Sequence, residues 1–130
     1  LITLVTVLVV WRTQFGSLPD ARRVLVLLPW IVLFAASNAF VEEAIFRLGV
    51  VASLAGRLRS SRVAVVSGAI FGGVHYFGVA PRGIAGLIMA GFIGWFLAKS
   101  VLETGGLFWA WTIHFVQDLV LFAFVLGTAT

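Results

Sequence analysis

The sequence predicts an all-α protein, a polytopic transmembrane bundle of about five helices. Three observations predict it: 62% of the 130 residues are hydrophobic, only 11% are charged, and the mean hydropathy is +1.13. A soluble domain has about 25% charged residues, so a soluble fold of this length could not cover its surface with so few charges. A lipid bilayer is the solvent that this composition fits.

Turn-forming residues divide the apolar sequence into helices. The apolar run at residues 1–11 is short of the roughly 17–25 residues that span a bilayer, so we expect it to be the remaining part of a longer helix. A signal-peptide core is the alternative, but no basic residue precedes the run and no cleavage site follows it. A turn at residues 16–20 comes next, with Asp20 as the cap of a long helix over residues 22–47 that continues or bends toward Leu58.

Further breaks define the rest of the bundle. Pro29 lies about two turns into the long helix and should kink it or mark a fresh start. The polar segment at residues 57–62 follows this helix, with Ser60 or Ser61 as the next N-cap. Three more helices are expected at residues 62–77, 83–101 and 107–127, separated by turns at residues 78–83 and 103–106. We expect a single domain over residues 1–130, the N-terminal part of which is missing.

Two of these helices carry small residues at every fourth position. They are Ala64, Gly68 and Gly72 in the third helix and Gly86, Ala90, Gly94 and Ala98 in the fourth. Such faces let helices approach closely in membranes. We therefore expect these two helices to pack against each other, which would fix the side chains on their other faces.

The charge distribution favours a membrane surface over nucleic acid as a partner. The net charge of +4 comes from arginines near helix ends, and no solvated basic face is available to hold a duplex. With five crossings, four basic residues would lie on each side, so the positive-inside rule gives no orientation. The five tryptophans are expected to anchor the interfaces, except where they face neighbouring helices. The chain has no cysteine, which excludes disulfides and thiol chemistry.

A pair of glutamates and an arginine stand at the far end of the long helix. Glu43 and Arg47 are four residues apart, acid before base, so they can pair on one helix face. Glu42 lies about 100° round the helix and cannot fully share that face. One carboxylate is thus left over, at an intramembrane cost of roughly 2.5–3.5 kcal/mol that a packing role does not explain. An acidic pair in contact with water and lipid headgroups is the alternative.

Two histidines and an aspartate follow in later helices. His75 comes soon after two consecutive glycines, which thin the helix and would let another backbone or a substrate approach. His114 and Asp118 are four residues apart and point the same way, a spacing that suits a metal site or a shared catalytic pocket. Taken singly, His75 could be a helix–helix hydrogen-bonding residue, and His114 and Asp118 could be an intrahelical pair.

These three segments contain nearly all the ionisable groups that lie inside the predicted helices. If the helices bundle, Glu42, His75, His114 and Asp118 can converge on one polar, water-filled cavity. A membrane protein is expected to keep such groups in that way, because lipid cannot solvate them. The sequence therefore predicts one chemical site inside the bundle.

The order of these motifs resembles the CAAX protease and bacteriocin-processing family, also called CPBP or Abi. The family pattern Glu-Glu-x-x-x-Arg, Phe-x-x-x-His and His-x-x-x-Asn/Asp is present as Glu42-Glu43-x-x-x-Arg47, Phe71-x-x-x-His75 and His114-x-x-x-Asp118. The pattern covers about residues 40–125. Each motif alone is weak, but all three in order on three hydrophobic helices make a strong resemblance.

The resemblance implies a helical intramembrane endopeptidase, whose eukaryotic relatives remove the last three residues of prenylated CAAX proteins. The mechanism proposed for the family is that of a glutamate-dependent protease without a required metal or other cofactor. It implies that Glu42 with His75 activates a water as general base. It also implies that Glu43 and Arg47 pair with each other and orient the site.

The resemblance further implies that His114 and the residue at position 118 stabilise the oxyanion of the tetrahedral intermediate. The CAAX endopeptidases usually have asparagine there, whereas this chain has Asp118. An ionised aspartate accepts hydrogen bonds and repels an oxyanion, and it can donate only if protonated. Asp118 could instead orient His114 or help to bind a metal.

Two other functions compete with the glutamate-dependent protease. A metallopeptidase would use zinc held by Glu42, His75 and His114, although no His-Glu-x-x-His motif is present. A non-enzymatic bacteriocin-immunity or membrane-scaffold protein could keep the same fold.

The expected surroundings are the same for all three functions. The bilayer is a partner in each case, and a protease would add a peptide or protein substrate in the membrane. The Ala-, Val- and Arg-rich, Lys-poor composition favours a bacterial inner membrane, and a prenylated substrate would follow only for a eukaryotic source. No oligomeric state follows from the sequence.

Overall fold

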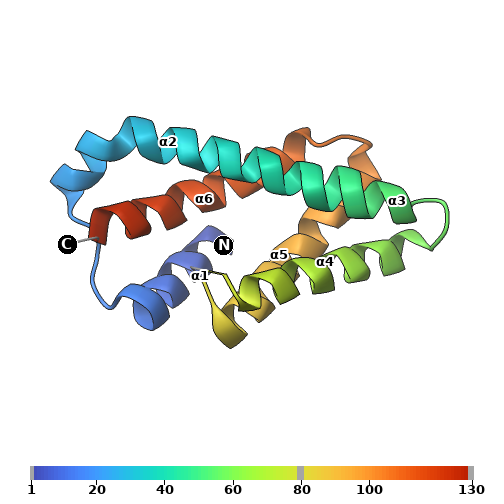
Figure 1. Cartoon of the computed structure of the whole chain (residues 1–130), viewed down its shortest axis with the longest axis horizontal. Helices are drawn as coiled ribbons and strands as arrows, with labels where there is room; N and C mark the ends of the chain where they lie inside the picture. The colour runs from blue at the N-terminus through green and yellow to red at the C-terminus, as the bar shows by residue number, and fades with distance from the viewer. Residues whose placement is uncertain (1, 79–80, 129–130) are drawn as a thin grey trace.

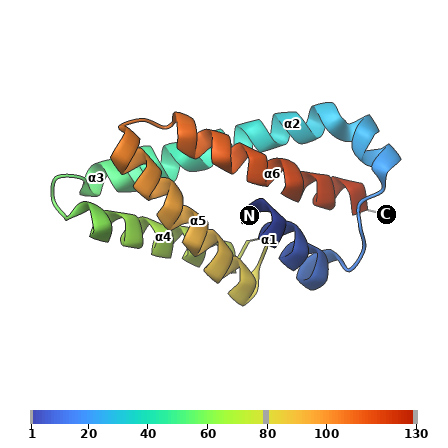
Figure 2. The ribbon, with the colours of Figure 1, turned by 180° about the vertical axis from the view of Figure 1, so that it is seen from behind.

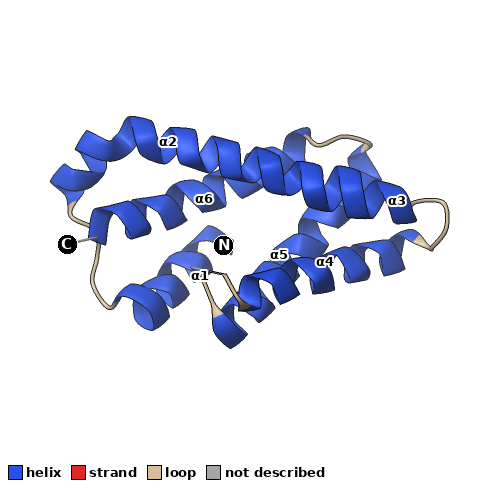
Figure 3. Cartoon of the chain, in the orientation of Figure 1, coloured by secondary structure: helices blue, strands red, loops and turns tan. Residues whose placement is uncertain are grey.

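The computed structural model describes residues 2–78 and 81–128, and nearly all of these residues are helical (Figure 3). In chain order the elements are α1 (Ile2–Val10), the π-helical segment η1 (Trp11–Phe15), α2 (Ala21–Glu43), the π-helical segment η2 (Ala44–Val51), α3 (Ala52–Leu54), α4 (Ser60–Tyr76), α5 (Gly83–Thr104) and α6 (Phe108–Thr128). Because α1 continues into η1, and α2 into η2 and α3, the described residues form five helical segments. The all-α prediction, with about five helices, is confirmed.

The second helical segment runs without a break from Ala21 to Leu54, a length of 34 residues. Asp20 caps it as predicted, because its side chain accepts a hydrogen bond of 2.7 Å from the backbone N–H of Arg23. Pro29 lies inside α2 and does not start a new helix. The first turns of α2 slope away from the rest of the helix (Figure 1), which is the kink expected where proline removes a backbone hydrogen bond.

Two predicted boundaries need correction. Neither Ser60 nor Ser61 is an N-cap, because the extended backbone that precedes α4 is at Arg59, and no side-chain hydrogen bond caps this helix. α5 continues past residue 101 to Thr104 and ends where Gly105 adopts a left-handed φ of 72°. The predicted turn at residues 78–83 includes residues 79 and 80, which lie outside the described residues.

The helices form two pairs (Figure 1, and from behind in Figure 2). α2 packs along α6, and α4 packs along α5. The pairs meet where η2 contacts α4 and where α5 contacts α6. α1 lies against α6, where Gln117 accepts a hydrogen bond of 3.0 Å from the Thr6 hydroxyl and donates one of 2.7 Å to the Thr3 hydroxyl.

The α4–α5 pair is so close that it leaves no room for side chains at its centre. A Cβ atom added to Gly72 would lie 2.4 Å from the backbone oxygen of Leu87, and one added to Gly68 would lie 2.7 Å from that of Gly91. Both distances are shorter than van der Waals contact, so only glycine fits at these positions. The predicted packing of the two small-residue faces is confirmed, and it fixes the end of α4 that carries His75.

The outer faces of the helices are apolar. Leu25 and Val26 on α2 and Ile84 and Ile88 on α5 are each about two-thirds exposed, an arrangement suited to lipid rather than to water. Among the described residues, three helices are long and apolar enough to cross a membrane: Ala21–Leu54, Gly83–Thr104 and Phe108–Thr128. The chain is therefore an integral membrane protein.

Candidate active site

The six side chains predicted to carry chemistry come together between α2, α4 and α6. Glu42 and Glu43 end α2, Arg47 follows in η2, His75 lies in the last turn of α4, and His114 and Asp118 lie in α6. Ion pairs and close polar contacts join all six into one cluster. The cluster lies where the two helix pairs meet, so each pair supplies part of it.

Glu43 and Arg47 form the buried part of the cluster. Glu43 Oε2 lies 3.0 Å from Arg47 Nε, and the two side chains are 1% and 0% exposed. The other carboxylate oxygen of Glu43 accepts a hydrogen bond of 2.8 Å from Nδ1 of His114. One oxygen of Glu43 is thus hydrogen-bonded to His114, and the other is ion-paired with Arg47 without a hydrogen bond. The spacing predicted the ion pair with Arg47, but it could not predict the bond to His114, because that bond crosses between helices.

Glu42, one residue earlier, is placed differently. Its side chain is 22% exposed, and its Oε2 lies 3.4 Å from Nε2 of His114 and 4.0 Å from Nε2 of His75. This oxygen accepts no hydrogen bond from the described residues. Glu42 therefore faces both histidines with unused capacity to accept a proton.

The contact between His75 and its own helix fixes which ring nitrogen carries hydrogen. Nδ1 lies 2.9 Å from the backbone carbonyl oxygen of Phe71. A carbonyl oxygen only accepts, so Nδ1 is the donor and, in the neutral ring, Nε2 carries a lone pair. This lone pair faces Glu42 across 4.0 Å. A single water can bridge such a gap by donating one hydrogen to each acceptor.

The ring of Phe71 contacts three polar side chains of the cluster. Its ring centroid lies 4.4 Å from that of His75 and 5.7 Å from that of His114. The guanidinium carbon of Arg47 lies 4.9 Å from the same centroid, a cation–π contact. Phe71 is buried, so one fixed ring sets the positions of three polar side chains. Phe71 belonged to a motif in the sequence, but no role was predicted for it.

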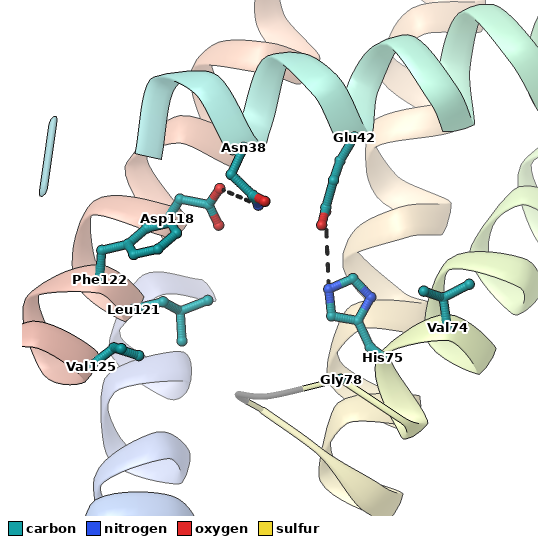
Figure 4. Close-up of a pocket in the computed structure, with 9 residues that line it drawn as sticks. All are labelled: Asn38, Glu42, Val74, His75, Gly78, Asp118, Leu121, Phe122 and Val125. Carbon is teal, nitrogen blue, oxygen red and sulfur yellow. Dashed lines mark hydrogen bonds and ion pairs between the residues drawn. The ribbon is translucent and has the colours of Figure 1, made fainter. Parts of the chain in front are cut away.

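Asp118 contacts two side chains. Its Oδ1 lies 3.6 Å from Nε2 of His114, which is close but is not a hydrogen bond. Its Oδ2 accepts a hydrogen bond of 3.0 Å from the side-chain amide of Asn38 on α2 (Figure 4). Asn38 was not predicted from the sequence. The available signal was its position four residues before Glu42, which places both side chains on one face of α2.

A cavity of about 350 Å³ opens beside the cluster (Figure 4). Its polar lining comes from Asn38, Glu42, His75 and Asp118, and its apolar lining from Val74, Gly78, Leu121, Phe122 and Val125. The volume lies within the range of ligand pockets. Because polar groups gather on one part of an otherwise apolar wall, the cavity suits a peptide bond flanked by apolar groups.

A zinc site made of Glu42, His75 and His114 is the predicted alternative use of these side chains. Within residues 2–78 and 81–128, no group of three or more histidine, aspartate or glutamate side chains is placed to hold a metal ion.

Comparison with known proteins identifies the family. The family model of type II CAAX prenyl endopeptidases, Rce1-like, matches residues 24–120, a range that contains all six clustered residues and Asn38. No match was found to a curated protein or to a solved structure. The family match covers well over half of the 130 residues, and it agrees with the resemblance in the motifs. The chain thus belongs to the Rce1-like family of type II CAAX prenyl endopeptidases, a family of membrane endopeptidases.

Proposed function

We propose that this chain is an intramembrane endopeptidase in which Glu42 and His75 together activate a water to attack a peptide bond. The observation that carries the proposal is the pair of acceptor atoms that face each other: Glu42 Oε2 and His75 Nε2, 4.0 Å apart at the cavity. A water that donates both hydrogens to these atoms keeps its lone pairs free for attack. Glu43 is unsuited to this role because it is buried, is ion-paired with Arg47, and is hydrogen-bonded to His114.

The proposed reaction conserves every proton. The water oxygen forms a bond to the carbonyl carbon of the substrate, and one water proton moves to the Glu42 carboxylate. The carbonyl π bond becomes a lone pair on the oxyanion of a tetrahedral intermediate. The C–N bond then breaks, the proton held by Glu42 passes to the leaving amine, and the carboxylate is restored for the next cycle.

His114 is the proposed donor to the oxyanion. Its Nδ1 already donates to Glu43, so Nε2 can donate as well when the ring is an imidazolium. Glu42, Glu43 and Asp118 all lie close to this ring and would stabilise such a positive charge. Glu43, held by Arg47, is the positioning residue, because it fixes the orientation of the His114 ring.

The proposed substrate is the C-terminal part of a membrane-associated peptide or protein. Two observations support this class: the apolar wall of the cavity, formed in part by Leu121, Phe122 and Val125, and the activity that names the family, cleavage of CAAX prenyl peptides. A bacterial inner membrane is the proposed location, from composition. A bacterial substrate would then carry an apolar group other than an enzymatically attached prenyl chain.

Replacement of Glu42 tests the proposed function. Purified wild type and Glu42→Ala are placed in liposomes with a fluorescence-quenched peptide that ends in a farnesylated CAAX sequence. In parallel, membranes that hold each variant are compared by peptidomics. We expect Glu42→Ala to abolish cleavage in both assays while the protein still accumulates in the membrane.

Glu103→Ala is the matched control, because Glu103 is an exposed carboxylate that pairs with Lys99 on α5, away from the cavity. It should cleave as wild type does. Equal cleavage by wild type and Glu42→Ala would rule out the proposed base. Full biological function of Glu42→Ala would support the non-enzymatic alternative, and activity lost to a chelator and restored by zinc would support the metallopeptidase.

A further inference from the structure

An oxyanion site needs hydrogen-bond donors, yet position 118 holds an aspartate, which in its ionised form can only accept. The structure places an amide directly against it. We propose that Asn38, a residue outside the three sequence motifs, donates its side-chain N–H to the substrate oxyanion and that Asp118 holds the amide in place. This inference rests on the proposed endopeptidase function and adds a catalytic residue to it.

The hydrogen bond between the two residues fixes the direction of the Asn38 amide. Nδ2 of Asn38 lies 3.0 Å from Oδ2 of Asp118. A carboxylate accepts, so the amide must present its NH₂ group to Asp118 and not its oxygen. An amide nitrogen carries two hydrogens, and this bond uses one. The second hydrogen has no partner among the described residues and is available to a ligand.

The position of Asn38 places this second hydrogen next to the proposed attacking water. Asn38 lies four residues before Glu42 on the same face of α2, and both side chains line the cavity. In Figure 4 the Asn38 side chain extends from α2 into the space between Asp118 and Glu42. A carbonyl group attacked by a water at Glu42 would therefore have the Asn38 amide beside it.

Asp118 is also well placed to orient two donors at once. Its Oδ2 faces Asn38 and its Oδ1 faces Nε2 of His114 at 3.6 Å. The two donors thus flank one carboxylate, one from α2 and one from within α6. An oxyanion bound between Asn38 and His114 would receive hydrogen bonds from both, which is the usual composition of an oxyanion hole.

A purely structural role for Asn38 makes different predictions. An interhelical hydrogen bond between α2 and α6 would stabilise the fold of a membrane protein without touching substrate. Asn38 could also serve only to offset the negative charge of Asp118. If Asn38 only offsets the charge of Asp118, removing that charge should compensate for loss of Asn38, whether or not a donor takes its place. If Asn38 only makes the interhelical hydrogen bond, Asn38→Ala should lower the unfolding temperature, and neither substitution at Asp118 should restore kcat.

A set of variants at these two positions separates the roles. The assay is hydrolysis of the quenched, farnesylated CAAX peptide by the full chain in liposomes. We expect Asn38→Ala to lower kcat by about 10²–10³-fold, the loss typical of one oxyanion donor, with KM nearly unchanged. Adding Asp118→Asn to Asn38→Ala should restore most of this loss, because the substituted side chain then supplies an amide donor. Adding Asp118→Ala should restore none of it.

Further measurements complete the comparison. Asn38→Ala should weaken binding of a peptide aldehyde, whose hydrate resembles the tetrahedral intermediate, far more than binding of the parent peptide. Ser37→Ala, at the exposed neighbouring position, is the matched control and should behave as wild type. Thermal unfolding in detergent reports whether each variant is folded.

Three outcomes would overturn the inference. If Glu42→Ala abolishes cleavage but Asn38→Ala leaves kcat unchanged, the inference fails while the proposed function stands. If Asp118→Ala rescues Asn38→Ala as well as Asp118→Asn does, or if neither substitution rescues it, Asn38 acts through charge or structure and not as a donor. If wild type and Glu42→Ala are equally inactive on this peptide and their membranes also give the same peptides in the peptidomic comparison, the proposed function itself fails, and the inference fails with it.

Discussion

The α4–α5 interface and the α2–α6 interface hold helices together in opposite ways. Between α4 and α5 the backbones touch, and a Cβ at Gly72 would lie 2.4 Å from a backbone oxygen of α5. Between α2 and α6 the contacts come from polar side chains, such as Asn38 with Asp118 and Glu43 with His114. Close packing therefore stabilises the first interface and leaves no space for larger side chains. The second interface leaves a cavity and polar groups that can carry out chemistry.

The two interfaces are connected through Phe71. A Cβ at Gly94 on α5 would lie 2.8 Å from the Cβ of Phe71, so the missing side chain of Gly94 is what makes room for this residue. On its other side the Phe71 ring contacts Arg47, His75 and His114. The packed interface therefore sets the position of the ring on which the polar interface depends.

The largest expected effect is loss of the packed interface. Gly72→Val would place a branched side chain where even one carbon lies 2.4 Å from the Leu87 oxygen. Overpacking typically costs about 1–3 kcal/mol and more where backbone must move, and we expect this variant to exceed that range and fail to fold. The measurement is the yield of monodisperse protein and its unfolding in detergent by circular dichroism.

Gly73→Ala is the control for that experiment, because a Cβ at Gly73 meets nothing within 4 Å. It should fold as wild type does or gain up to about 1 kcal/mol from helix propensity. A folded Gly72→Val protein with wild-type stability would show that the α4–α5 contact is not as tight as described.

The next effect concerns the buried ion pair of the polar interface. Arg47→Met leaves the Glu43 carboxylate buried without its arginine and should lower the free energy of unfolding by about 3–5 kcal/mol. Adding Glu43→Leu should recover part of the loss, since no uncompensated charge then remains. Unfolding in mixed detergent micelles measures both changes.

Lys99→Met is the control, because it removes the exposed pair with Glu103. It should lower the free energy of unfolding by at most about 0.5 kcal/mol. If Arg47→Met lowered it by no more than Lys99→Met does, the buried pair would not have the stabilising role described.

A smaller change tests the link between the two interfaces. Gly94→Ala should push Phe71 away and cost about 1–3 kcal/mol in stability. It should also lower kcat for the quenched peptide, because the rings of His75 and His114 shift with Phe71. Gly91→Ala serves as the control, since its Cβ would meet only ordinary contacts from 3.5 Å. Equal kcat values for the two variants would mean that the site is not coupled to α5 through Phe71.

The smallest effect is expected at α1. Gln117→Leu removes the hydrogen bonds to Thr3 and Thr6 and should cost about 0.6–1.7 kcal/mol, the range for interhelical hydrogen bonds in membranes. The Glu42 cluster should be unaffected, so kcat should change little. Limited proteolysis of the segment between α1 and α2 would report a loosened α1. Unchanged protection in Gln117→Leu would show that apolar packing alone holds α1.

The sequence predicted much of the fold because its signals are local. The turns predicted at residues 16–20 and 103–106 are present, and Gly16 and Gly105 adopt left-handed backbone there. The small residues of α4 and α5 identified the faces that meet. The predicted caps at Ser60 and Ser61 failed because serine also occurs in a first helical turn. The observed N-cap, Arg59, is only one residue before Ser60, and the type of side chain does not determine on which of these residues the helix begins.

The candidate site could be predicted only in part, for a related reason. Helix spacing shows which side chains share a face, and it gave the pairing of Glu43 with Arg47. It cannot show which side chain of another helix lies opposite. The bond of His114 to Glu43 and the bond of Asn38 to Asp118 both cross between helices, so they appear only when the bundle is assembled.

The unbroken length of the second helix has a consequence for where cleavage would take place. From Ala21 to Glu42 there are 21 residue steps, or about 32 Å at 1.5 Å per residue, close to the thickness of the hydrocarbon layer. A tilt of about 20° shortens this by only a few per cent. If Arg22 and Arg23 lie at one headgroup layer, Glu42 lies at the depth of the other. The scissile bond would then be cut near a membrane surface, where bulk water can replace the water molecule that each hydrolysis consumes.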